Sequence, residues 1–338
     1  MRTFAGKMNN GDFTMTLLRW FRDNGRELPW RTTTDPYAVW LSEIILQQTR
    51  ISQGREYWER FMRRWPTVEQ LAAATEDEVL REWQGLGYYS RARNLHTAAR
   101  QIVAGGGFPT TLEGLRALKG VGDYTAAAIG SIAFGLPAAV VDGNVYRVLS
   151  RHFGIETPIN TTEGKHEFTS LAQALLPADR ASDFNQAMMD FGAIQCTPQS
   201  PHCEACPLQE SCDAFRTGRT ALLPVKLKTL TVKERRLTYI YIRYAHETAI
   251  HRRQAGDIWQ GLYEPLLTTA VPQGAVLLRQ NVRHVLTHRI LLADFYLWQP
   301  DERPQLPEGY FWISEDDIGQ YGVPRLIEIM LNEINNRE

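Results

Sequence analysis

The segment CTPQSPHCEACPLQESC, residues 196–212, contains every cysteine of the 338-residue chain. Its four thiols belong to Cys196, Cys203, Cys206 and Cys212, with the spacing C-x6-C-x2-C-x5-C. Four cysteines confined to one short segment indicate a shared metal centre rather than a framework of disulfides. Zinc and iron–sulfur clusters both take thiolate ligands, and a spacing with a single C-x2-C pair does not choose between them. Unligated core cysteines would not cluster in this way, so we expect the four thiolates to converge on one centre.

The composition is that of an ordinary globular protein, with 43% hydrophobic and 22% charged residues and a net charge of −1. Because the chain as a whole is not basic, a surface that binds polyanions must be a local basic patch. The arginine-rich residues 81–100 are the obvious candidate, although a solvated helix face explains these residues equally well. No apolar run reaches the ~18 residues of a membrane span, and the N-terminus lacks the apolar core of a signal peptide. Free thiolates fit a reducing interior. We expect an intracellular monomer that works away from membranes, in the cytoplasm or nucleoid, or in the nucleus of a eukaryote.

Helical periodicity dominates from residue 13 to about residue 216, whereas the first ten or so residues are expected to be poorly ordered. Asp35-Pro36 is typical of a helix start, with Asp at the N-cap and Pro at the first helical position, and the helix is predicted to run over 37–53. Glycine and proline turns separate the other expected helices. These helices are predicted at 67–74, 76–84, 90–104, 111–118, 124–134, 142–153, 163–176 and 181–191.

The character of the sequence changes after Pro224. Residues 230–243 (LTVKERRLTYIYIR) are rich in β-branched and aromatic residues with period-2 stretches, which predicts a strand. Shorter strand-like runs occur at 275–278 and 293–298, and a helix is predicted at 324–335. We therefore expect a helical domain over residues 10–221, a linker over 222–234 and a smaller α+β domain over 235–338.

The segment LKGVG, residues 118–122, is predicted to join two helices. Gly120 and Gly122 allow a tight turn and a close approach of the backbone to a ligand. Amides near the N-terminus of the next helix can point at an anion. This helix-hairpin-helix pattern binds nucleic-acid phosphates, and such contacts position a protein without reading sequence. Taken alone, the pattern is also compatible with a plain glycine turn.

Two carboxylates have settings that suit the cleavage of a glycosidic bond. Asp142 follows an apolar run and precedes a helix, whose dipole favours the ionised form, although a plain N-cap would look the same. Glu43 lies in the apolar stretch WLSEIIL, where burial would raise its pKa and suit a general acid. Helical phase does not exclude an exposed Glu43. If the two meet in space, they form a pair that can act through an oxocarbenium-like state.

Six motifs occur in order and resemble the MutY family of adenine DNA glycosylases, in the endonuclease III-like helix-hairpin-helix superfamily. The resemblance extends over essentially the whole chain. Five of the motifs are LPWR (28–31), WLSEIILQQTR (40–50), GLGYYSRARNL (85–95), LKGVGDYTAAAI (118–129) and VDGNVYRV (140–148), and the sixth is the cysteine segment. The resemblance implies a mainly α N-terminal glycosylase domain with an iron–sulfur loop, and a smaller α+β Nudix-like C-terminal domain. It also implies one [4Fe–4S] cluster per subunit on the four cysteines.

The resemblance further implies the reaction, which is removal of adenine mispaired with 8-oxoguanine, or with guanine, in duplex DNA after the base is flipped out. Glu43 matches the general acid that protonates adenine at N7. Asp142 matches the residue that stabilises the cation at C1′, and Asn144 matches its orienting partner. Relatives that also cut the strand carry a lysine at the position of Tyr124, where it forms a Schiff base. A phenol cannot do so, which predicts a monofunctional enzyme that leaves an abasic site. Tyr124 itself matches a residue that supports the transition state, and the alternative is a packing aromatic.

Further positions carry over one by one from the family motifs. Gln48 and Tyr88 match residues that wedge into the duplex, and Thr49 and Leu86 match neighbours of the 8-oxoguanine. Gly120 and Gly122 match the phosphate-binding hairpin. The adenine pocket is expected to include Arg26, Trp30, Arg31 and Asp190, with Asp190 as acceptor for the exocyclic amine.

The second domain resembles the family's Nudix-like recognition domain. It lacks the G-x5-E…RE-x2-EE arrangement that binds Mg²⁺, so we expect no nucleotide hydrolysis there. Thr287 and His288 match the loop that senses 8-oxoguanine, often Phe-Ser-His in the family. Here Leu286 replaces the aromatic residue while Thr287 keeps the hydroxyl, which changes how the loop can grip the oxidised base.

Two other functions remain possible at this point. One is a relative that acts on oxidised pyrimidines and cleaves the strand, against which Tyr124 argues. The other is a lesion reader that binds without cutting, against which Glu43 and Asp142 argue.

Overall fold

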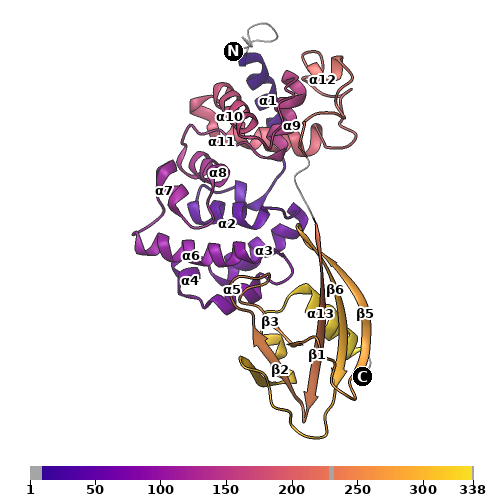
Figure 1. Cartoon of the computed structure of the whole chain (residues 1–338). Helices are drawn as coiled ribbons and strands as arrows, with labels where there is room; N and C mark the ends of the chain where they lie inside the picture. The colour runs from indigo at the N-terminus through magenta and orange to yellow at the C-terminus, as the bar shows by residue number, and fades with distance from the viewer. Residues whose placement is uncertain (1–9, 228–231, 337–338) are drawn as a thin grey trace. The chain divides into compact units, whose positions relative to one another are not determined.

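The computed structural model describes residues 10–227 and 232–336 of the chain (Figure 1). The chain divides into two compact units, one formed by residues 1–48 and 101–228 and the other by residues 49–100 and 229–338. In this division, residues 49–100 belong to the same compact unit as the C-terminal part of the chain. The domain boundaries expected from the sequence, at residues 221 and 235, remain a prediction. The N-terminal residues expected to be poorly ordered, up to residue 9, and residues 228–231 of the expected linker lie outside the described part.

In the described residues of the first unit, the regular secondary structure is all helical, and long loops such as residues 196–212 join the helices. The α-helices of this unit are α1 (Asn10–Asn24), α2 (Pro36–Leu46), α7 (Leu112–Ala117), α8 (Asp123–Phe134), α9 (Gly143–Phe153), α10 (Thr162–Leu175), α11 (Ala181–Asp190) and α12 (Asp213–Arg216). Short 3-10 turns lie at Pro29–Arg31 and Ala178–Arg180, and a π-helical segment, Phe191–Gln195, continues α11. A π-helical turn is rare and often lies at a functional site.

The core of this unit is built by α1, α9, α10 and α11, which lie side by side (Figure 1). Phe13 and Leu17 of α1 meet Leu149 of α9, Phe168 of α10 and Phe184 of α11. The cysteine segment is attached to the same core, because Leu208 is buried in it and Cys196 and Cys206 pack against it. The predicted metal segment is therefore part of the fold rather than an appendage.

The predicted start of α2 is confirmed. The Asp35 carboxylate accepts hydrogen bonds from the N–H groups of Tyr37 and Ala38, and Pro36 occupies the first helical position. The prediction of one helix over 37–53 is wrong, because α2 ends at Leu46 and α3 begins at Ile51. Gln48 in the break has φ 57°, a left-handed conformation that leaves the helix. No glycine or proline marks this break, which is why periodicity extended the helix across it.

The second unit combines four helices of the first half of the chain with the C-terminal sheet. The helices are α3 (Ile51–Arg64), α4 (Val68–Ala73), α5 (Glu76–Glu82) and α6 (Ser90–Ala104), whose last residues belong to the first unit. The strands are β1 (Lys233–Tyr244), β2 (Glu247–Arg252), β3 (Tyr263–Glu264), β4 (Leu266–Leu267), β5 (Val276–Val285), β6 (Arg289–Trp298) and β7 (Tyr310–Ser314). A 3-10 turn, Glu315–Gln320, and α13 (Arg325–Asn335) complete the unit.

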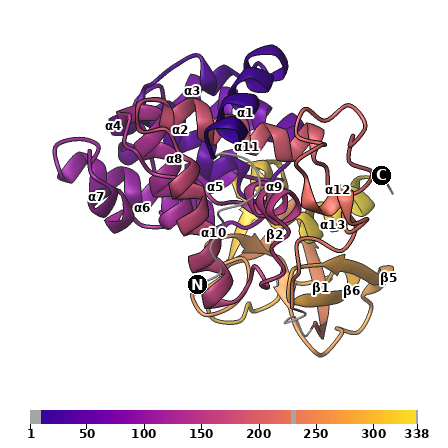
Figure 2. The same cartoon turned by 90° about the horizontal axis from the view of Figure 1, so that it is seen from above.

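The sheet is mixed, with the order β3-β2-β1-β6-β5, while β4 pairs with β1 and β7 with β2. β1 and β6 run parallel, from Lys233 opposite Arg289 to Ile242 opposite Trp298. α13 lies along one face of the sheet (Figures 1 and 2), where Met330 and Ile327 join Phe295 in a buried cluster. Among the described residues, no helix is both long and apolar enough to pass through a bilayer.

The other predicted helices agree with the structure to within a residue or two at their ends. The strand runs were predicted too short at 275–278 and 293–298, since β5 and β6 extend over ten residues each. The strands β2, β3, β4 and β7 were not predicted. These strands are short, and they form by pairing with β1 or β2, so the sequence along each of them carries little signal of a strand.

Candidate active site

Glu43 and Tyr124 are brought together in the first unit, although 81 residues separate them in sequence. Glu43 projects from α2 and is 8% exposed, and Tyr124 lies in the first turn of α8. The Tyr124 hydroxyl donates a hydrogen bond of 2.9 Å to Glu43 Oε2 and also lies 3.5 Å from Met189 Sδ. The exposed alternative for Glu43 is thereby excluded.

Burial raises the pKa of Glu43 to about 7, against 4.5 for an ordinary glutamate. The hydrogen bond from Tyr124 opposes this rise, the negative charge of Asp142 adds to it, and the charge of Arg31 opposes it. Burial also raises the pKa of Tyr124 well above its usual value, so the phenol keeps its proton and can only donate to Glu43 at neutral pH. A carboxyl group with a pKa near 7 can hold a proton and release it at physiological pH.

Asp142 is the N-cap of α9, and its carboxylate is surrounded by N–H groups. Oδ1 accepts hydrogen bonds from the backbone N–H groups of Asn144 (2.9 Å) and Val145 (2.8 Å), and Oδ2 accepts one from Asn144 Nδ2 (2.8 Å). Burial raises the pKa of Asp142 above its usual value overall, although these three donors and the charge of Arg147 oppose the rise. Since Asp142 influences the pKa of Glu43, the two carboxyl groups share one electrostatic environment.

Arg147, a residue not predicted from the sequence, links this carboxylate to the cysteine segment. Its Nη2 donates to Asn144 Oδ1 (2.8 Å) and to the Gly192 carbonyl (2.6 Å), and its Nε donates to the Cys196 carbonyl (2.8 Å). Gly192 is required here, because a Cβ would lie 2.5 Å from the Asn144 Cβ and 2.9 Å from its backbone oxygen. The only signal in the sequence was the position of Arg147, five residues after Asp142 on the same short helix.

The residues predicted for the adenine pocket come together around Asp190, which is fully buried. Arg31 donates to both carboxylate oxygens at 2.7 Å, and Arg26 donates through its backbone N–H, at 2.9 Å, and through its guanidinium. Burial raises the pKa of Asp190, but these arginines lower it below its usual value overall. Trp30 is buried in the same segment. Acceptance of the adenine amine by Asp190 stays a prediction, and it requires one of these contacts to open, because the oxygens are already occupied.

The hairpin LKGVG joins α7 to α8 as predicted. Gly120 has φ 80°, which favours glycine, and Gly122 is the N-cap of α8 in an extended conformation. A Cβ at Gly122 would meet nothing within 4 Å, and both glycines are exposed. Gly122 has no side chain to cap α8, so the first N–H groups of the helix are left available to an anion.

The predicted lesion contacts are distributed between the two units. Gln48 is exposed in the first unit. In the second unit, Tyr88 is exposed at the turn before α6, while Leu86 is buried and would meet a lesion only through its backbone. Thr49 Oγ1 accepts a hydrogen bond of 3.3 Å from Arg91. Thr287 and His288 are exposed at the tip between β5 and β6, and Thr287 lies 2.8 Å from the Tyr88 hydroxyl.

The four cysteines line one cavity, together with side chains of α9 that include Arg151 and His152. All four are free thiols of intermediate exposure. Burial, with the charges of the other three cysteines, raises the pKa of Cys206 to about 12, so this thiol keeps its proton at neutral pH unless a cation binds it. Among the described residues, no group of three or more His, Cys, Asp or Glu side chains is placed to hold a single metal ion.

Arg151, a second residue missed from the sequence, supports this cavity. It is 2% exposed and donates to Cys196 Sγ (3.4 Å), to the Thr197 carbonyl (2.7 Å) and to the Pro198 carbonyl (3.2 Å). Its charge offsets thiolate charge, and its carbonyl contacts hold the start of the segment. The donor set, the shared cavity and this positive neighbour fit an iron–sulfur cluster.

Three family models match the chain. Residues 41–174 match the HhH-GPD superfamily of base excision DNA repair proteins, residues 196–212 match the iron–sulfur binding domain of endonuclease III, and residues 238–333 match the NUDIX domain. The predicted fold class is confirmed by these matches. The predicted metal segment coincides with the iron–sulfur domain from its first cysteine to its last.

The chain is similar to DNA glycosylases in sequence and in structure. An adenine DNA glycosylase of Buchnera aphidicola (subspecies Schizaphis graminum) is 34% identical over 254 residues, which covers 74% of this chain and 73% of that protein. The adenine DNA glycosylase of Rattus norvegicus is 46% identical over 226 residues, 63% of this chain, so the match spans only 44% of that relative. A thermostable thymine-DNA glycosylase superposes with a TM-score of 0.58 at 32% identity, covering 62% of this chain and 97% of that one.

Proposed function

Because the chain belongs to the adenine DNA glycosylase family, we propose that it removes adenine from duplex DNA in which adenine is mispaired with 8-oxoguanine or with guanine. The names of the relatives indicate adenine as the base that is removed, and the resemblance of the motifs indicates its mispair with 8-oxoguanine or guanine. A stacked adenine cannot be reached by the enzyme, so it must be flipped into a pocket. Such an enzyme works inside the cell, where the DNA is.

Glu43 is the proposed general acid, and its environment is the observation that carries the proposal. Departure of adenine leaves negative charge on the base, which protonation at N7 neutralises. A carboxyl with a pKa of about 7 keeps its proton in a large fraction of molecules at neutral pH, whereas an ordinary glutamate does not. The Tyr124 hydroxyl fixes the orientation of this group.

Asp142 is the proposed stabiliser of the cation that develops at C1′ as the bond to adenine breaks. Three N–H donors and the N-terminus of α9 favour its ionised form, and an anion next to the sugar is what an oxocarbenium-like state requires. Asn144 holds the carboxylate in position, and Arg147 holds Asn144. Because Tyr124 stands where a Schiff-base lysine would be needed, the product is an abasic site in an uncut strand.

DNA is the proposed partner, gripped in the first unit by the hairpin with Gly120 and Gly122 through a backbone phosphate. The second unit contributes Tyr88 as a wedge and the tip with Thr287 and His288 as the contact with 8-oxoguanine. The four cysteines would hold one [4Fe–4S] cluster, whose contribution is to fix the segment 196–212 in place. The bond-breaking groups lie outside that segment.

One set of incubations tests the activity. The protein is mixed with a duplex that carries adenine opposite 8-oxoguanine, and separately with a thymine glycol duplex, each with and without alkali. We expect breaks in the adenine strand that need alkali. Breaks without alkali on thymine glycol would instead identify a strand-cleaving enzyme, and tight binding without breaks would identify a lesion reader.

Two conservative substitutions test the roles. Asp142→Asn keeps the N-cap, since Asn and Asp cap helices equally well, so a loss of at least about a hundredfold in single-turnover rate with lesion binding retained would be chemical in origin. Glu43→Gln should cost about 10²- to 10⁴-fold. Glu163→Gln, at an exposed glutamate of α10, is the matched control. Near-wild-type rates in either active-site variant would reject that assignment.

A further inference from the structure

Tyr88, proposed above as the wedge, is held in the free protein by contacts within the second unit. Its backbone has φ 47°, a left-handed conformation that non-glycine residues rarely adopt, between Gly87 (φ 72°) and α6. Its ring lies 5.5 Å from the guanidinium of Arg91, which also lies 5.0 Å from the Trp83 ring. The side chain remains half exposed, so these contacts position an open ring rather than bury it.

The far end of the ring is tied to the C-terminal sheet. The Tyr88 and Thr287 hydroxyls are 2.8 Å apart, and either can donate. Thr287 lies in a tight turn between β5 and β6, closed by a hydrogen bond from Leu286 N–H to the Arg289 carbonyl (2.8 Å). A bond between two partly exposed hydroxyls restrains the ring only if this turn is itself fixed.

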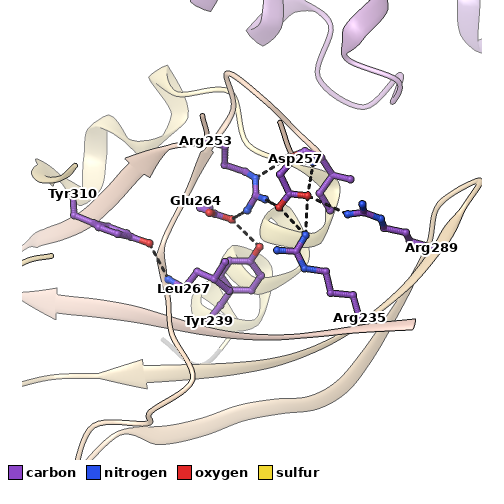
Figure 3. A network of polar contacts seen from close by, with 9 residues as sticks. Arg235, Tyr239, Arg253, Asp257, Glu264, Leu267, Arg289 and Tyr310 are labelled. Carbon is purple, nitrogen blue, oxygen red and sulfur yellow. Dashed lines mark hydrogen bonds and ion pairs between the residues drawn. The ribbon is translucent and has the colours of Figure 1, made fainter. Parts of the chain in front are cut away.

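A charged network fixes the turn at its base (Figure 3). Arg289, the first residue of β6, donates to Asp257 Oδ1 at 3.1 Å. Arg235 of β1 donates to both oxygens of Asp257 at 2.7 and 2.8 Å, and Arg253 donates to it at 2.6 Å. The buried Arg253 also pairs with Glu264, which accepts a bond from Tyr239 at 2.8 Å.

Asp257 is therefore the point at which β1, β6 and the buried Arg253–Glu264 pair are joined. Partial burial would raise the pKa of Asp257, but the bonds from Arg235 and the Ile258 N–H, with the arginine charges, hold it at about 2. The carboxylate thus stays ionised at any physiological pH. Three arginines on one carboxylate make charge-assisted bonds, which are stronger than bonds between neutral groups.

We propose that Thr287 is a positioning residue for Tyr88, and that Asp257 is a positioning residue for the turn that carries Thr287. The hydroxyl of Thr287 sets the angle of the Tyr88 ring before DNA arrives, so the C-terminal sheet prepares the wedge as well as meeting the lesion. This inference rests on the proposed function for the meaning of the wedge, but the restraint on the ring is a property of the free protein. The Thr287 hydroxyl is enough to restrain the Tyr88 ring, although the neighbouring residue is Leu286 rather than an aromatic residue.

The restraint can be measured without DNA. The full-length, cluster-loaded protein is labelled with 3-fluorotyrosine, and the ¹⁹F resonance of residue 88 is assigned by its loss in Tyr88→Phe. Thr287→Val, which keeps the shape and removes the hydroxyl, should shift and narrow that resonance, whereas Thr287→Ser should leave it as in the wild type. Asp257→Asn should move the ¹⁹F resonance of residue 88 toward its position in Thr287→Val. Asp294→Asn, a control substitution on β6, should leave the resonance unchanged. An unchanged resonance in Thr287→Val would overturn the proposal.

A double-mutant cycle then connects the restraint to DNA. Dissociation constants for the 8-oxoguanine duplex are measured in the excision-deficient Glu43→Gln background. Tyr88→Phe and Thr287→Val should each weaken binding about fivefold, and the double variant should lose no more than either alone. Additive losses would overturn the coupling. If no variant bound lesion DNA at all, the proposed function would fail while the ¹⁹F result still decided the restraint.

Discussion

Replacing Glu43 by glutamine should make the protein more stable while it removes the excision activity. Folding places the Glu43 carboxyl inside α2, 8% exposed and flanked by apolar residues. Glutamine has nearly the same shape, and its side-chain oxygen can still accept the Tyr124 hydrogen bond. The substitution therefore removes the cost of burying a charge and little else.

The size of the gain follows from the pKa of Glu43, which burial raises from 4.5 to about 7. Below pH 4.5 the carboxyl is protonated in both folded and unfolded chains, so the substitution should change stability little. Between pH 4.5 and 7 the unfolded chain ionises first, and the wild type loses stability as pH rises. Each pH unit corresponds to about 1.4 kcal/mol, so the variant should gain on the order of 3 kcal/mol above pH 7.

Thermal unfolding of the two proteins at matched scan rates, from pH 5 to pH 8.5, measures this gain. The difference in Tm should grow from near zero to about 5–10 °C and then level off above pH 7. Glu163→Gln, at an exposed site, should give no such trend. A gain that is absent, or that does not depend on pH, would refute the reasoning, because Glu43 would then not be held as a costly buried acid.

Three further predictions concern other parts of the site. Tyr124→Phe removes a hydrogen bond that lowers the pKa of Glu43. The pH above which the single-turnover excision rate falls should therefore rise by about one unit. An alkaline limb of the pH profile that is unchanged or moves to lower pH would contradict this. Gly192→Ala should drive a Cβ into Asn144, destabilise the protein by about 1–3 kcal/mol in denaturant titrations and lower the excision rate more than tenfold. Cys206→Ser should lower the visible absorbance of the cluster, the Tm and the affinity for duplex DNA together; an unchanged absorbance would exclude Cys206 as a ligand.

Matched variants separate these effects from general damage. Tyr146→Phe removes the hydroxyl of a tyrosine whose ring packs edge-to-face with Phe168, and it should leave the pH profile of excision unchanged. Gly143→Ala places a Cβ where nothing lies within 4 Å, one residue from Asp142, so it should be tolerated where Gly192→Ala is not. Equal losses in both glycine variants would show that α9 resists any substitution and would remove the steric argument.

Local signals in the sequence were sufficient for features that depend on local chemistry. Asp35-Pro36 marks the start of α2, because an N-cap and a first-turn proline act through their own backbone. The cysteine spacing marked the metal segment because the ligands lie close together in sequence. The LKGVG turn was readable because φ 80° at Gly120 requires a glycine.

Features that depend on tertiary contacts were beyond those signals. The burial of Glu43 could not be read from an apolar stretch whose phase allowed either face, and its contact with Tyr124 spans 81 residues. The five donors around Asp190 come from two arginines more than 150 residues away. Gln48 leaves the helix in a left-handed conformation without any glycine or proline to signal the break.

Glu43 is buried and Asp142 is half-buried, and the hydrogen-bond donors around the two carboxyl groups differ in a way that suits different roles. Among the residues that the structure describes, one phenol and no N–H group donates to Glu43, so little compensates its charge, and it holds a proton up to about pH 7. Burial raises the pKa of Asp142 as well, but three N–H donors, the N-terminus of α9 and the charge of Arg147 oppose the rise and favour the anion. The charge of the Asp142 anion in turn raises the pKa of Glu43 and so favours the protonated form of that acid. One acid and one anion in a shared environment are what protonation of a leaving base and stabilisation of a sugar cation require.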